Sequence, residues 1–158
     1  MPVQPGRFAA TLEGDFVLFL IGMRINKPLL VHKWLPVARA MPRMLQELSA
    51  QPELGLLHAQ ASISGLTIST TQYWRSFDHL HAYAHAKDGV HLPAWAAFNR
   101  AIGNNGAVGI YHESYLVRAG EYESVYANMP RSGLARAGQW HPATGRMQSA
   151  RSRLNKNP

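Results

Sequence analysis

Cysteine is absent from this 158-residue chain, and acidic residues are scarce. Without a thiol, the protein has no disulfide framework, no thiolate-bound zinc or iron–sulfur cluster and no cysteine nucleophile. Nine Asp and Glu stand against 16 Lys and Arg, and no pair of carboxylates suggests glycosidase chemistry. The eight histidines are therefore nearly the only side chains left for acid–base chemistry.

Several sequence motifs are also missing. The segment Gly-Asn-Asn-Gly at 103–106 lacks the Lys-Ser/Thr of a phosphate loop, and neither a dinucleotide fingerprint nor a Gly-x-Ser-x-Gly elbow occurs. The first 14 residues have no apolar core of the signal-peptide type, so we expect no targeting signal there. The longest apolar run, 16–21, is far shorter than the ~20 residues that span a bilayer. We therefore expect a cytoplasmic protein without a membrane partner.

The positive charge is concentrated at the C-terminal end. Residues 1–130 carry ten Lys and Arg against nine Asp and Glu, whereas residues 131–158 carry six and none. The second stretch is also rich in Gly, Ser, Asn and Pro. We predict one folded domain over 1–130 and a basic, extended tail over 131–158. Because the domain is nearly neutral and its aromatics are not interleaved with cations, we expect no nucleic-acid partner.

Hydrophobic periodicity predicts an alternation of strands and helices. Residues 15–25 are apolar nearly throughout, which is typical of a strand buried on both faces. Apolar residues at three- and four-residue steps predict a helix from Trp34 to just before Pro52, kinked or broken at Pro42. Further strands are predicted at 56–62, 66–74, 107–117 and 121–127, and further helices at 77–87 and 93–103.

This order predicts an α+β fold of the ferredoxin-like βαββαβ type, with an extra short helix and a C-terminal strand. Such a sheet carries its helices on one face only, and a short chain has little else to cover the other face. We therefore expect a homodimer whose two sheets pack face to face.

Two histidines are candidates for chemistry. His91 precedes a helix on which Trp95, Phe98 and Asn99 recur at helical steps, so it could line a pocket or simply bond to the helix start. His112 alternates along a strand with mostly apolar residues. It is either a satisfied core histidine or a pocket histidine that acts as base, hydrogen-bond donor or haem contact.

Three further residues are candidates for binding. Arg24 is the one cation in an apolar strand and must pair with an anion or a carbonyl, or reach water at the strand end. Tyr73 and Trp74 end a strand and could line a pocket or belong to the core. His81 and His85 share a helix face, but the local sequence fixes no third ligand, so we expect no metal site.

Several segments resemble known oxygenases. The run from Tyr73 to Phe77, followed by Asp88 to Trp95, resembles the antibiotic-biosynthesis-monooxygenase superfamily. More narrowly, the chain over about residues 10–135 resembles the fumagillin-pathway monooxygenase-like family in six segments: 23–28, 33–36, 41–45, 95–100, 109–113 and 126–130. The resemblance implies a dimeric α/β barrel with a pocket between sheet and helices in each subunit. It also suggests oxygenation of an organic substrate, either without a cofactor or with haem.

We therefore expect a monooxygenase-like oxidoreductase that acts on an apolar or aromatic small molecule. In the cofactor-free route His112 would take a proton from the substrate and Asn99 would hold the resulting anion, with His91 as the second working histidine. The alternative is a haem enzyme of the same barrel, peroxidase-like or aldoxime-dehydratase-like, with His91 as axial ligand. The expected substrate-binding residues are Arg24, Tyr73, Trp74, Trp95 and Phe98. A ligand-binding module without catalysis is a third possibility.

Overall fold

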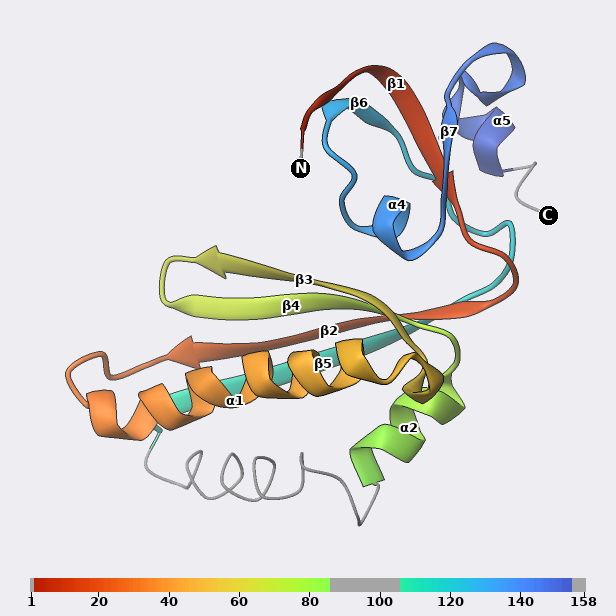
Figure 1. Ribbon diagram of the computed structural model, residues 1–158. Helices are drawn as coiled ribbons and strands as arrows, with labels where there is room; N and C mark the ends of the chain where they lie inside the picture. Colours follow the sequence, from red (N-terminus) through yellow and green to blue (C-terminus); the bar gives the residue numbers. More distant parts are fainter. Residues whose placement is uncertain (1, 86–105, 155–158) are drawn as a thin grey trace.

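The computed structural model describes residues 2–85 and 106–154, which form two antiparallel sheets with helices around the larger one (Figure 1). The predicted short helix at 93–103 lies outside the described residues, as do His91, Trp95, Phe98 and Asn99. Within the described ranges, no helix combines the length and hydropathy needed to cross a bilayer.

The larger sheet has the strand order β3-β4-β2-β5, with β2 at Phe16–Ile25, β3 at Leu56–Ser64, β4 at Thr67–Trp74 and β5 at Val108–Val117. Helix α1 (Val31–Ala50) and the short 3-10 helix η1 (Pro52–Leu54) connect β2 to β3, and helix α2 (Phe77–His85) follows β4. Within this sheet, the first strand, β2, thus pairs with the third, β4, and the fourth, β5, and all pairs are antiparallel. This order confirms the predicted ferredoxin-like α+β fold.

Strand β2 is central because it is apolar on both faces. Val17, Ile21 and Met23 are buried on the side of α1, and Phe16 is buried on the opposite side. Two apolar faces let one strand anchor two layers, so β2 pairs along its length with β4 and β5.

Helix α1 runs through Pro42, so a break at that position was wrong, whereas a kink there stays a prediction. The proline removes one backbone hydrogen bond and costs about 3 kcal/mol in a helix interior. Val37, Ala40, Met44 and Leu48 are buried along one side of the helix and hold it against the sheet. The packing of this stripe outweighs the local penalty.

The smaller sheet, in the order β6-β1-β7, joins the two ends of the chain. Strand β1 (Gln4–Thr11) pairs with β6 (Tyr126–Met129) on one side and with β7 (Gln139–Pro142) on the other. Helix α4 (Leu134–Ala137), the 3-10 helix η2 (Gly145–Met147) and helix α5 (Ala150–Leu154) complete this part. Over residues 134–154 these elements stand where we predicted an extended tail.

The smaller sheet and α4 cover one end of the face of the larger sheet that is turned away from α1 (Figure 1). Leu134 and Ala135 of α4 pack with Ala10 of β1 and Phe16 of β2 in one core. The chain itself therefore covers part of the face that we had assigned to a second subunit. The same core also joins residues on both sides of the predicted boundary at 130.

Arg153 is the buried cation of this C-terminal part, with only 4% of its surface exposed. Its Nε donates to Oε2 of Glu123 at 2.8 Å, and its Nη1 donates to the carbonyl oxygens of Met147 and Gln148 at 2.9 and 3.0 Å. One guanidinium thereby ties α5 to η2 and to the loop before β6. A charge removed from water is stable only when its donors are paired in this way.

We predict that Arg153→Met destabilises the protein by about 2 kcal/mol, because Glu123 and two carbonyl groups lose a charged partner. The exposed Arg151 on the same helix provides the control, and Arg151→Met should change stability by less than about 0.5 kcal/mol. Chemical denaturation measures both. Equal midpoints for the two variants would show that Arg153 does not anchor the C-terminal part.

Candidate functional site

Two adjoining cavities lie between α1 and the sheet. The larger, of about 180 Å³, is lined by apolar residues of β2, β4, β5 and α1, including Met23, Val37 and Ile68. The smaller, of about 80 Å³, extends toward α2. Ile21, Met41 and Leu45 line both. A dry cavity of about 150 Å³ can bind benzene, so the larger cavity has room for about one ring and the pair for a somewhat longer ligand.

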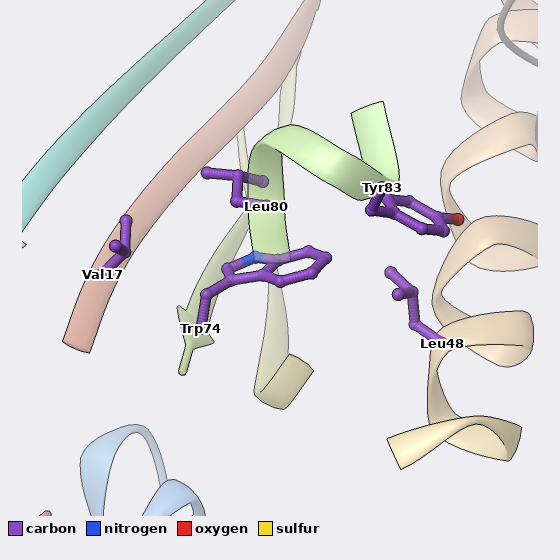
Figure 2. Close-up of a cluster of buried hydrophobic side chains, with 5 residues drawn as sticks. All are labelled: Val17, Leu48, Trp74, Leu80 and Tyr83. Atoms are coloured by element: carbon purple, nitrogen blue, oxygen red, sulfur yellow. The ribbon is translucent and has the colours of Figure 1, made fainter. Parts of the chain in front are cut away.

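Trp74 closes the smaller cavity and is 1% exposed. Figure 2 shows its indole between Leu80 and Tyr83 of α2 and Leu48 of α1. The Tyr83 hydroxyl donates to Oε2 of Glu47 at 3.3 Å. Burial and the Glu47 carboxylate raise the pKa of Tyr83, so this phenol stays protonated and links α2 to α1.

A chain of buried polar groups runs along β4 beneath these cavities. Trp74 Nε1 donates to Oε1 of Gln72 at 2.9 Å, and Gln72 Nε2 donates to Oγ1 of Thr70 at 3.0 Å. Gln72 Nε2 also lies 3.8 Å from the sulfur of Met41. Gln72 and Thr70 are buried, and Thr70 lines the larger cavity. Since its oxygen accepts from Gln72, the Thr70 hydroxyl has its own hydrogen to donate.

Thr70 and Gln72 are functional candidates that the sequence analysis missed. They alternate with Trp74 along one strand, so the two-residue period places all three on the same face. That period was the available signal. The residue types obscure this signal, because Thr and Gln side chains more often face water than a buried cavity.

His112 lies on the same side of the sheet as the cavities. In the strand register His112 of β5 is opposite Ile21 of β2, and Ile21 is opposite Thr70 of β4. With strands ~4.8 Å apart, the row places the Cα atoms of His112 and Thr70 roughly 10 Å apart. The His112 ring is exposed and lies 5.9 Å from the ring of Phe19, which lines the smaller cavity.

Arg24 and Tyr73 lie on the opposite face of the sheet. Arg24 is exposed at the end of β2, where its Nη1 donates to Oδ1 of Asn26 at 2.8 Å. Tyr73 packs with the core beneath α4. Burial and the neighbouring Tyr126 raise the pKa of the Tyr73 phenol. The structure thus brings Trp74 and His112 to the cavity side and places these two residues away from it.

Two of the three histidines of α2, His81 and His85, form a stacked pair. Their rings lie 4.1 Å apart, and Nδ1 of His85 lies 2.8 Å from the carbonyl oxygen of His81. Over residues 2–85 and 106–154, no group of three His, Asp or Glu side chains is placed to bind a metal ion.

The fold and the cavities thus define a ferredoxin-like α+β domain with an apolar, partly hydrogen-bonding site under its sheet. Residues 16–134 match the sequence profile of the monooxygenase af470-like family, and the chain belongs to that family. This range contains the whole larger sheet and every described residue that lines the two cavities.

One relative is monooxygenase af470 of Aspergillus fumigatus, with which the chain shares 31% identity over 124 residues. The match takes in 73% of this chain and 44% of the relative, so the chain spans less than half of that protein's length. Among solved structures, SnoaB, a cofactor-independent oxygenase from Streptomyces nogalater, aligns with a TM-score of 0.46 and 17% identity over 66% of this chain and 94% of that one. A likeness at this level does not bear on activity or cofactor use here.

We predict that Gln72→Leu destabilises the fold by about 1–3 kcal/mol, because it leaves the buried indole N–H of Trp74 without its acceptor. The matched control is Gln46→Leu, at an exposed position of α1. Thermal or chemical unfolding measures the difference. If both variants unfold together, the polar chain does not contribute to stability.

Proposed function

We propose that this protein is a monooxygenase that oxidises an apolar or aromatic small molecule in the cavities under its sheet. The observation that carries the proposal is the hydrogen-bond chain from Trp74 through Gln72 to Thr70, which ends at an apolar cavity. Membership of the monooxygenase af470-like family supports the reaction class. The size of the cavities favours a substrate of about one or two rings.

The chemistry that suits this arrangement starts from a CH₂ group next to a carbonyl. His112, at the exposed edge of the row, would take the proton and pass it to solvent. The Thr70 hydroxyl would donate to the enolate oxygen, and its acidity is enhanced because its oxygen already accepts from Gln72. Oxygen then adds to the carbon, and CH₂ plus O₂ yields C=O plus H₂O. The substrate supplies the electrons, so no external reductant is consumed.

Four of the site residues predicted from the sequence lie outside the described ranges, and they keep their expected roles in this proposal. Asn99 would assist Thr70 in holding the anion, His91 would be the second working histidine, and Trp95 and Phe98 would line the remaining wall. Haem bound through His91 stays the alternative. The described residues favour the cofactor-free route, because a porphyrin is several times larger than the single ring that the 180 Å³ cavity suits.

Oxygen consumption with 2-tetralone, a two-ring ketone with an acidic CH₂, tests the proposal. We predict turnover by the wild-type protein and a drop in kcat of roughly a hundredfold for Thr70→Val, as for the loss of one oxyanion donor. Thr71→Val is the matched control, because Thr71 is the next residue of β4 and faces the other side of the sheet. Equal rates for the two variants would exclude Thr70 as the donor.

Two further measurements in the same assay separate the alternatives. Full turnover by both His112→Ala and His91→Ala would exclude the histidines from proton transfer. An absorption spectrum of the purified protein with a Soret band that disappears in His91→Ala would replace the cofactor-free route with the haem route. A spectrum without such a band, before and after added haemin, would leave the cofactor-free route in place.

We also propose that the chain forms a homodimer through the open part of the face turned away from α1. There the ring of Tyr111 lies over Gly22, where an added Cβ would collide with it, and Tyr115, four residues further along the same face of β5, is about half exposed. Broad aromatic rings of this kind are enriched at subunit interfaces. The smaller sheet leaves this half of the face uncovered.

Light scattering is expected to give twice the 17.5 kDa mass of one chain. Tyr111→Glu should shift the protein to the monomer, because it places a charge in the interface. Leu116→Ser, at an exposed position on the other side of β5, should leave the dimer intact. A monomeric wild-type protein would contradict the proposal.

A further inference from the structure

Five large apolar side chains are exposed at one end of the molecule. They lie in or next to two connections, the β2–α1 loop and the β3–β4 hairpin, and Figure 1 shows both at the same end of the larger sheet. The Ile25 N–H donates to the carbonyl of Leu66 at 2.8 Å, which brings the hairpin beside the end of β2. We call these side chains the apolar tip: Leu29, Leu30, Val31, Ile63 and Leu66.

All five side chains of the apolar tip are exposed, but to different extents. Leu29 is 95% exposed and Ile63 is 76% exposed, whereas Leu30, Leu66 and Val31 are 36–45% exposed. Scattered exposed leucines are ordinary on soluble proteins, whereas a group of them at one end marks an interaction site. Hydrophobic side chains of this size are stabilised when a partner removes them from water.

In the described segments that form the apolar tip, the charge has one sign. Residues 16–46 contain five Lys and Arg and no Asp or Glu, and residues 54–74 contain no charged residue. Arg24 and Lys27 flank the loop before Leu29, and Lys33 follows it on α1. We call Arg24, Lys27 and Lys33 the basic collar. The acidic residues nearest in sequence are Asp15, at the other end of β2, and Glu47, near the end of α1.

We propose that the apolar tip inserts among the headgroups of an anionic phospholipid surface, with the basic collar against the phosphates. An apolar group with cations on the same loop and at the adjoining ends of β2 and α1 matches both layers of such a surface, the acyl boundary and the negative headgroups. A nucleic acid would use the cations but gain nothing from the exposed leucines. This differs from our expectation of no membrane partner, which rested on the lack of a spanning segment and not on side-chain exposure.

The larger cavity lies toward the same end of the molecule as the apolar tip, and this position bears on how a substrate could enter. Met23, Ile68 and Val37, which line it, lie near the tip ends of β2, β4 and α1. A lipid-soluble substrate could then pass from the bilayer to the cavity over a short apolar path. This step rests on the proposed monooxygenase function, whereas binding of the tip to lipid does not.

Co-sedimentation of the full chain with vesicles tests the proposal. We expect the wild-type protein to bind vesicles with 30% phosphatidylserine at least tenfold more tightly than vesicles of phosphatidylcholine alone, and to dissociate in high salt. Leu29→Ser combined with Leu30→Ser should weaken binding at least tenfold. Lys33→Gln should weaken it about fivefold, the effect of one cation near such a surface.

Matched controls lie at the opposite end of the molecule. Leu116→Ser removes a leucine that is 71% exposed, between the exposures of Leu29 and Leu30, and Arg151→Gln removes an exposed cation. Both should bind like the wild type. The proposal is overturned if wild-type binding does not depend on the charge of the lipid, or if the variant that combines Leu29→Ser with Leu30→Ser binds like the wild type. It is also overturned if the double variant changes the solution mass, because the tip would then be a contact between copies. None of these readouts depends on turnover, so the proposed activity can fail independently.

Discussion

The structure depends on one strand that is apolar on both faces. Strand β2 contributes Val17, Ile21 and Met23 to the side of α1 and Phe16 to the side of the smaller sheet. Its neighbours β4 and β5 are fixed in register against it over nearly their whole length. The row from His112 through Ile21 to Thr70 exists only because this register holds. A slip of one residue would turn every side chain of the row to the other face.

The buried amide of Gln72 provides the hydrogen-bond acceptor that the buried indole of Trp74 needs. An indole N–H inside an apolar core costs free energy unless an acceptor is present. Gln72 supplies that acceptor to Trp74, and its own N–H then needs a partner, which is Thr70. Each buried polar group along β4 thus needs a hydrogen-bond partner on the next, and the last of these groups is the Thr70 hydroxyl at the larger cavity. Structural satisfaction and a polarised hydroxyl in the site are thus two results of one hydrogen-bond chain.

The larger sheet and its helices follow from local patterns, and so they could be predicted. The strands and helices expected from periodicity match β2, α1, β3, β4, α2 and β5 closely, because each carries its own apolar face. Strands β1 and β7 carry no such signal. They pair across about 130 residues, as with Ala9 opposite His141, and gain their stability from that distant contact. The buried Arg153 was equally hidden, because its partners come from elements that the sequence did not predict.

The candidate site could have been predicted more closely from the two-residue period of strand β4. Tyr73 and Trp74 were both assigned to the pocket, although adjacent residues of a strand point to opposite faces. Applied strictly, the two-residue period selects Trp74 with Gln72 and Thr70, and it sends Tyr73 and Arg24 to the other side. The two ends of the larger sheet also differ in how completely they are packed. The smaller sheet and α4 pack against one end in a single apolar core. The stability gained there offsets the cost of the larger cavity and of the exposed apolar tip toward the other end, which folding alone would not favour.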